Sequence, residues 1–299
     1  MALTPRVEAW RARGEQTSAL GHQIQFLHRP GGGPALLLLH GFPSSSYDWR
    51  HVLDAQSERE ALCFDFLGFG LSEKPRDHDY SLLWQADLAA DLAKRCLGRP
   101  CLLVAHDMGT SVATELIARD IEGRLDFELA GALLFNGSIF QERAQLTLGQ
   151  RLLHSPIGPL AARLSSERFF HRQFASIFSP DHPLEPEEAA DQWALLRYNA
   201  GQRIGHRLVR YIDERKRHRE RWHGALRAWP KPLSFLWGMR DPVAVPAILD
   251  GLRELRPAAP VTELADVGHY AQIEAPERVA AAVGRALEMD GSAGVELGE

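Results

Sequence analysis

The sequence has 299 residues, of which 45% are hydrophobic and 24% are charged, and its formal net charge at pH 7 is -5. A chain of this size and composition folds as an ordinary globular protein, either as one large domain or as a domain with an insertion. The negative net charge argues against a general nucleic-acid binder.

No targeting or membrane-spanning signal stands out in the sequence. The segment from Met1 to Trp10 has no basic region followed by an apolar run, so we expect no signal peptide. No apolar stretch approaches the roughly 20 residues needed to cross a bilayer. The three cysteines, Cys63, Cys96 and Cys101, lack metal-ligand spacing and fit a reducing compartment. We therefore expect a cytoplasmic protein, and the absence of phosphate-cradling and zinc motifs predicts no cofactor and no metal. The sequence leaves the oligomeric state open.

The first half of the chain alternates predicted strands and helices. Residues 6–13 and 23–28 alternate in strand fashion and predict an opening antiparallel hairpin. Further along, the patterns predict strands over residues 35–39, 61–65, 101–105 and 129–135, with helices over residues 44–56, 81–97 and 108–119. This alternation indicates an α/β fold in which a mostly parallel sheet has helices on both faces.

The second half contains a long segment with a different pattern. Between residues 138 and 229 no strand is evident, and apolar residues recur at helical spacing between several prolines. The sheet pattern then resumes with predicted strands at 232–237 and 261–264 and helices at 245–255 and 276–287. We therefore predict a core formed by residues 1–137 and 230–290, a helical cap inserted at 138–229, and a frayed tail at 291–299.

The stretch CLLVAHDMGTSVAT, residues 101–114, predicts a strand that turns sharply into a helix. Its centre has the form of a nucleophile elbow, in which small residues flank the nucleophile on a strained turn. Ala105 and Gly109 are the small residues, because larger side chains would collide where the strand folds back onto the helix. The nucleophile position is therefore occupied by Asp107 rather than by Ser or Cys. Asp107 could instead simply cap the following helix.

A carboxylate nucleophile favours a particular chemistry. With an unperturbed pKa of about 3.9, an aspartate is already an anion at neutral pH and needs no base to activate it. It is a poor agent for cleaving amides but can displace a leaving group from saturated carbon. The expected product is an alkyl ester on Asp107, which an activated water must then hydrolyse.

Two further residues follow predicted strands in an informative order. Asp241 comes after the strand at 232–237, and His269 comes after the strand at 261–264. The order nucleophile, acid, histidine is that of the α/β-hydrolase fold. In this interpretation His269 is the base that activates water, and Asp241 orients its imidazole. The backbone N–H groups of Phe42 and Met108 are placed to form the oxyanion hole for the hydrolysis step.

Five motifs together resemble one family across nearly the whole chain. They are HGFPSSSYDW at 40–49, DFLGFGLSEKP at 65–75, VAHDMG at 104–109, WGMRDP at 237–242 and VGHYAQIEAPE at 267–277. They are similar to those of the α/β-hydrolase family of epoxide hydrolases and haloalkane dehalogenases. The predicted cap, with FNGSIF and YIDERKRHRERWHGAL, resembles most closely the mesoderm-specific transcript branch. The resemblance implies an Asp107, His269, Asp241 triad and a small apolar electrophile as substrate.

Departures from the family pattern favour one substrate class. Haloalkane dehalogenases hold the departing halide with a Trp after the nucleophile and commonly an Asn or second Trp nearby. Those positions hold Met108 and Phe42, which have no side-chain N–H, although Trp193 could substitute. Epoxide hydrolases usually protonate the epoxide oxygen with a pair of cap tyrosines, and Tyr198 and Tyr211 are the candidates here.

Epoxide hydrolysis is therefore the leading expectation, ahead of dehalogenation and of β-lactone opening with release of an alkene. A binding protein on a hydrolase scaffold is the alternative from another class.

Other polar residues have weaker signals. Asn136 follows a predicted strand and His106 precedes Asp107, so both are candidate substrate-binding residues. Asp65 lies beside the predicted glycine-rich turn, where we expect it to have a structural rather than a catalytic role. The Arg-rich segment at 210–227 could bind an anionic partner or membrane surface, but we expect a solvated helix of the cap.

Overall fold

A computed structural model describes residues 2–289 of the chain. The frayed tail predicted at 291–299 lies outside the described residues. Within residues 2–289, no helix is both long enough and apolar enough to cross a membrane.

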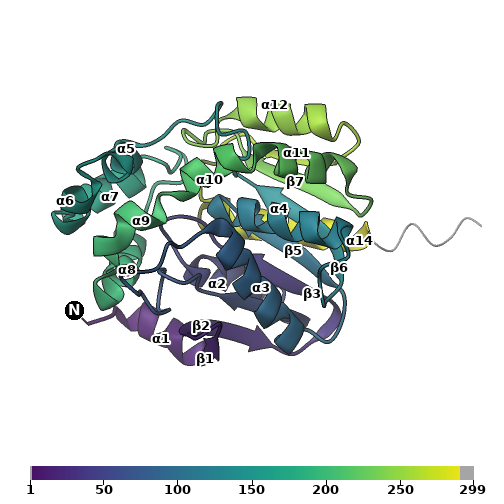
Figure 1. The fold of residues 1–299 in the computed structure, drawn as a ribbon, viewed down its shortest axis with the longest axis horizontal. Helices are drawn as coiled ribbons and strands as arrows, with labels where there is room; N and C mark the ends of the chain where they lie inside the picture. The colour runs from purple at the N-terminus through teal and green to yellow at the C-terminus, as the bar shows by residue number, and fades with distance from the viewer. Residues whose placement is uncertain (1, 290–299) are drawn as a thin grey trace, which may run out of the picture.

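The centre of the molecule is an eight-stranded sheet with the order β1-β2-β4-β3-β5-β6-β7-β8 (Figure 1). Six neighbouring strands, β4 to β8 in this order, run parallel, whereas β2 is antiparallel to both β1 and β4. The strands are β1 (Glu15–Ala19), β2 (His22–Arg29), β3 (Gly32–Leu39), β4 (Arg59–Phe64), β5 (Cys101–His106), β6 (Leu129–Phe135), β7 (Leu233–Gly238) and β8 (Val261–Leu264). The predicted α/β fold with a mostly parallel sheet is confirmed.

Helices cover both faces of this sheet, which explains its continuous aliphatic strands. In β3, Leu37 and Leu39 pack into the core on one face, and Leu36 and Leu38 pack into the core on the other. The first face is covered by α3 (Leu82–Cys96), α4 (Met108–Ile121), α11 (Arg219–Ala228) and α12 (Pro246–Leu255). The second is covered by α1 (Pro5–Arg13), the 3-10 helix η1 (Ser46–Trp49), α2 (Arg50–Ala55), α13 (Ala271–Glu274) and α14 (Pro276–Glu288).

The opening hairpin was predicted at the wrong place. Pro5–Arg13 is helix α1, and the hairpin is formed by β1 and β2. The Thr4 side chain accepts a hydrogen bond from the Val7 N–H, and Pro5 is the first helical residue. This N-cap and the burial of Val7 and Trp10 on one helical face outweigh the apparent alternation.

The chain between β6 and β7 forms only helices and loops within residues 138–229, which we call the inserted segment. Its helices are α5 (Leu148–His154), α6 (Gly158–Arg163), α7 (Glu167–Ala175), α8 (Pro186–Arg197), the 3-10 helix η2 (Tyr198–Ile204), α9 (Gly205–Leu208), α10 (Tyr211–Arg217) and α11. Figure 1 shows α5 to α9 gathered at one end of the molecule, whereas α11 lies along α4 on the sheet.

Candidate active site

Asp107 lies on a strained turn between β5 and α4. Its backbone has φ 44° and ψ -113°, a region that side-chain-bearing residues rarely adopt. The turn brings α4 against the end of β3, where a Cβ on Gly109 would lie 2.6 Å from the carbonyl oxygens of Leu39 and His40. Strand, strained residue and close-packed helix are the features that define a nucleophile elbow.

The Asp107 carboxylate is buried and held by two groups from different parts of the chain. The Phe42 N–H donates to Oδ2 at 2.9 Å, and the Arg215 guanidinium lies 3.5 Å from Oδ1. Burial raises the pKa of Asp107, but Arg215, His269, His106 and the Phe42 N–H together hold it below the usual value. Asp107 is therefore an anion at neutral pH.

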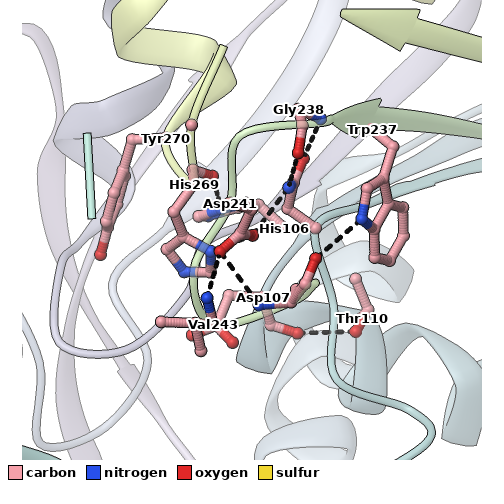
Figure 2. A network of polar contacts seen from close by, with 12 residues as sticks. His106, Asp107, Thr110, Trp237, Gly238, Asp241, Val243, His269 and Tyr270 are labelled. Atoms are coloured by element: carbon pink, nitrogen blue, oxygen red, sulfur yellow. Dashed lines mark hydrogen bonds and ion pairs between the residues drawn. The ribbon is translucent and has the colours of Figure 1, made fainter. Parts of the chain in front are cut away.

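His269 and Asp241 form a buried hydrogen-bonded pair beside Asp107 (Figure 2). The distance from His269 Nδ1 to Asp241 Oδ2 is 2.7 Å. The other carboxylate oxygen, Oδ1, accepts hydrogen bonds from the backbone N–H groups of Val243 and Ala244 at 2.7 and 3.0 Å. Burial lowers the pKa of His269, but the Asp241 carboxylate and, less strongly, Asp107 raise it above the usual value. The pair can accept a proton at Nε2, because Nδ1 is engaged by Asp241.

Asn136 and His106 contact this pair and are not among the residues that line the cavity beside His269. The Asn136 side chain donates to Asp241 Oδ2 at 2.7 Å and accepts from the Gly238 N–H at 2.9 Å. His106 Nε2 lies 2.8 Å from the backbone oxygen of His269, and burial lowers its pKa to about 3. A neutral His106 that donates to this oxygen fixes the backbone that carries His269.

Arg215 was missed by sequence reasoning, which placed it in a solvated helix. Its side chain is only 2% exposed and donates from Nη2 to the Asp107 backbone oxygen at 3.0 Å and from Nε to Ser111 Oγ at 2.9 Å. The guanidinium also lies over the Tyr211 ring, 4.6 Å from its centroid. The signal was present, because Leu208, Tyr211 and Arg215 recur at helical spacing on one face.

An apolar cavity opens beside His269 and Phe42. Its walls come from the inserted segment, chiefly Gln150 and Leu153 of α5 and the phenylalanines of α7, and from Val243 of the core. Tyr211 is not among the lining residues but lies behind two of them: its ring centroid is 5.5 Å from that of Phe42, and its hydroxyl accepts from Gln150 Nε2 at 3.0 Å. The cavity therefore offers an apolar surface with few polar groups.

Tyr198 and Trp193, the other two aromatic candidates, lie outside the cavity lining. Tyr198 packs against the core on the opposite face of the sheet, with Lys74 over its ring, and it is not among the residues that line the cavity. Trp193 is buried against Phe170, in a cluster that includes Tyr270, and its indole N–H has no hydrogen-bond partner within residues 2–289. The structure thus does not bring Tyr198 and Tyr211 together as a pair.

The predicted oxyanion donors differ in what they contact. A hydrogen bond joins the Phe42 N–H to Asp107, but the Met108 N–H makes none among the described residues.

Within residues 2–289, no group of three or more His, Cys, Asp or Glu side chains could hold a metal ion.

A comparison with family models matches residues 36–282 to the model described as alpha/beta hydrolase family. The chain belongs to this family. The match spans the strands and the turns that carry Asp107, Asp241 and His269, so the recognised resemblance is confirmed at the level of the family.

Relatives across nearly the full length support the same assignment. A protein named as the hydrolase LipZ from Mycobacterium tuberculosis is 52% identical over 279 residues, covering 93% of this chain and 97% of LipZ. The mesoderm-specific transcript protein of Mus musculus is 36% identical over 289 residues, covering 92% and 85% of the two chains. The crystal structure of haloalkane dehalogenase DbeA from Bradyrhizobium elkani has a TM-score of 0.79 at 23% identity, covering 94% of this alpha/beta hydrolase and 99% of DbeA.

Proposed function

We propose that this alpha/beta hydrolase opens a small or medium apolar epoxide through a covalent ester on Asp107. The observation that carries the proposal is an ionised carboxylate on an elbow turn, bound at Oδ2 by a backbone N–H and beside a histidine paired with Asp241. An anionic carboxylate is ready to attack carbon, and the adjacent histidine provides a base for the second step.

In the first step, Asp107 Oδ1 attacks a saturated carbon of the three-membered ring. The new O–C bond forms as the ring C–O bond breaks, and the electron pair of that bond goes to the ring oxygen. We assign the attack to Oδ1 because the Phe42 N–H already binds Oδ2. The alkoxide must be protonated as it leaves, and this requires an acid near the ring oxygen.

In the second step, His269 removes a proton from water, and the hydroxide attacks the ester carbonyl carbon of Asp107. The electron pair of the carbonyl moves to Oδ2, where the Phe42 N–H stabilises the oxyanion; the Met108 N–H, at the start of α4, is the second donor we assign. Collapse of this intermediate breaks the bond between the Asp107 carboxyl carbon and Oδ1, and His269 gives its proton to that oxygen as it leaves with the substrate. The proton left on the new Asp107 carboxyl restores the acid used in the first step, and a diol leaves. The net reaction is addition of water to the epoxide.

Tyr211 is the acid that supports an epoxide as substrate. Its hydroxyl accepts a hydrogen bond from Gln150, whose carbonyl oxygen is fixed by the Thr147 N–H at 2.8 Å. Gln150 thus presents its amide N–H₂ to the Tyr211 oxygen and leaves the phenol hydrogen to be donated elsewhere. No acceptor for that hydrogen is recorded within residues 2–289. One tyrosine therefore takes the place of the expected pair.

Haloalkane dehalogenation is a second candidate, and Trp193 favours it. Its buried indole N–H has no partner in the described part of the chain, and such a donor binds a halide readily, although Trp193 packs behind the lining residue Phe170 and does not itself line the cavity. The structurally similar DbeA is a haloalkane dehalogenase. The apolar cavity equally suits the third candidate, a β-lactone with a long chain.

The nucleophile and the electrophile class can be identified together by trapping the ester. His269→Ala is exposed to terminal epoxides, haloalkanes and β-lactones, and intact-protein mass and peptide mapping follow. We expect an adduct on Asp107 whose added mass equals that of the whole epoxide, whereas a haloalkane would add its mass less that of the hydrogen halide. His269→Ala/Asp107→Asn is the control and should remain unmodified. A folded His269→Ala protein that no electrophile modifies would favour a binding protein on this scaffold.

The role of Tyr211 is tested in the same background. Tyr211→Phe should slow formation of the epoxide adduct by about 10² to 10⁴-fold, since it removes the acid, and should leave the haloalkane reaction unchanged. Tyr198→Phe is the matched control and should alkylate at the parent rate. Equal slowing with both electrophiles would mean that Tyr211 only shapes the cavity.

A further inference from the structure

The Arg215 guanidinium is an unusual neighbour for the Asp107 carboxylate. Both side chains are 2% exposed, and Asp107 is the only carboxylate that pairs with Arg215 among residues 2–289. The two residues come from distant parts of the chain, because Arg215 belongs to α10 of the inserted segment and Asp107 follows β5 of the sheet. Arg215 is also held by Ser111 and by the face of the Tyr211 ring, so it is fixed in place.

A buried cation without a matching anion is strongly unfavourable. In the free protein the negative charge of Asp107 balances Arg215. Ester formation removes that charge from Asp107 and creates one negative charge on the group that leaves the carbon. The total charge of the site is unchanged, but the anion that Arg215 needs is now on the substrate.

We propose that Arg215 forms an anion-binding subsite that takes the oxygen anion of the leaving group when Asp107 is converted to an ester. The proposal rests on the function proposed above and deepens it by naming the chemistry of the substrate. The leaving group is an oxygen that stays attached to the substrate, as the alkoxide of an opened epoxide or the carboxylate of an opened lactone. For an alkoxide, Arg215 stabilises the charge until the Tyr211 proton is transferred.

The surroundings of Arg215 favour oxygen over halide. Guanidinium N–H groups bind oxygen anions through directed, charge-assisted hydrogen bonds. Tyr211, four residues earlier on the same face of α10, packs its ring against the guanidinium and carries an O–H donor at the end of that ring. The two groups together match an oxygen anion, which accepts several hydrogen bonds at once.

The subsite can be tested without any turnover. Asp107→Asn has nearly the same shape as the wild type but lacks the charge, as the ester does, so Arg215 is left without its anion. Isothermal titration calorimetry with acetate, butyrate, hexanoate, chloride and bromide compares this variant with the wild type. We expect the carboxylates to bind Asp107→Asn at least about tenfold more tightly than they bind the wild type, and more tightly than the halides do.

Two control variants show whether the gain depends on Arg215. Asp107→Asn/Arg215→Met should lose it, whereas Asp107→Asn/Arg219→Met should keep it, because Arg219 is half-exposed and pairs with Glu142 at the surface. No gain in Asp107→Asn, a gain that survives removal of Arg215, or tighter binding of bromide than of carboxylates would overturn the proposal.

A kinetic measurement separates this inference from the proposed function and does not depend on the folding of Asp107→Asn. In the His269→Ala background, Arg215→Met should form the epoxide adduct about 100-fold more slowly, and Arg215→Lys should recover part of the rate. Adduct formation at the parent rate in Arg215→Met would overturn the subsite while leaving the Asp107 ester intact. Absence of any adduct in the His269→Ala parent would instead contradict the proposed function, and the binding experiment would still test the subsite.

Discussion

His269 is a buried imidazole on which opposing effects act. Burial disfavours its charged form, but the hydrogen-bonded Asp241 carboxylate and the nearby Asp107 carboxylate favour it, and the net effect is a raised pKa. A base must be neutral to accept a proton from water. The rate of ester hydrolysis should therefore rise with pH through a pKa above about 6.5 and level off beyond it.

Asp241→Asn tests which group raises the pKa of His269. The substitution removes a charge and replaces a carboxylate hydrogen bond, so the His269 pKa should fall by at least about one pH unit. Histidine NMR titrations of the wild type and the variant give the two values. His106 is an internal control, because its pKa of about 3 keeps it neutral between about pH 5 and 9. An unchanged His269 pKa in Asp241→Asn would mean that Asp107 alone supplies the stabilising charge.

At the scale of elements, the strands and helices of the sheet were predicted well from local patterns. The predicted range 129–135 coincides with β6, because a continuous apolar run between turn residues is distinctive, and the predicted range 261–264 coincides with the short strand β8. The helix predicted over 81–97 is α3, whose Ser81 side chain caps it by accepting from the Trp84 N–H. Such features lie within a few residues of one another and can be found in a single sequence.

Contacts between distant elements could not be predicted in the same way. Arg215 meets an aspartate 108 positions earlier, and the segment that contains it is so rich in arginine that a solvated helix was the natural interpretation. Local spacing places Arg215 on the buried face of α10, but only the three-dimensional packing shows that the partner is Asp107. Likewise, Tyr198 and Tyr211 are equivalent in the sequence, and the packing of η2 and α10 separates them.

The elbow depends on how closely α4 approaches β3, and Gly109 tests this. A Cβ at this position would lie 2.6 Å from two backbone oxygens, which cannot rotate away as a side chain could. Gly109→Ala should therefore shift α4 and lower the free energy of unfolding in urea by about 1–3 kcal/mol. Gly224→Ala on α11 is the matched control: its Cβ would meet nothing within 4 Å, so the free energy of unfolding should stay level or rise by up to about 1 kcal/mol. Equal effects of the two substitutions would show that close approach at the elbow contributes little.

At the scale of the whole molecule, hydrogen bonds to buried acidic side chains connect the inserted segment to the rest of the chain at two places. On one side, Asp191 of α8 accepts hydrogen bonds from Arg6 Nε at 2.6 Å, from the Tyr47 hydroxyl at 2.7 Å and from the Thr4 hydroxyl. On the other, Glu115 of α4 accepts from Arg221 and Trp222 of α11 at 2.8 and 3.0 Å. Because Arg215 and most of the cavity walls belong to the inserted segment, these contacts hold the site together.

Asp191→Ala tests the first attachment. The substitution leaves the buried Tyr47 hydroxyl without its acceptor, which should cost about 1–3 kcal/mol of unfolding free energy in urea. The lost pairing with Arg6 adds little, since that arginine is half exposed to solvent. Asp250→Ala, which removes an exposed carboxylate 3.5 Å from Arg253, is the control and should change the free energy by less than about 0.5 kcal/mol. Amide hydrogen exchange then locates the effect. Faster exchange confined to α8 would mean that the attachment stabilises only the inserted segment. Faster exchange that extends to β3 and β5 would mean that the inserted segment and the sheet unfold as one cooperative unit.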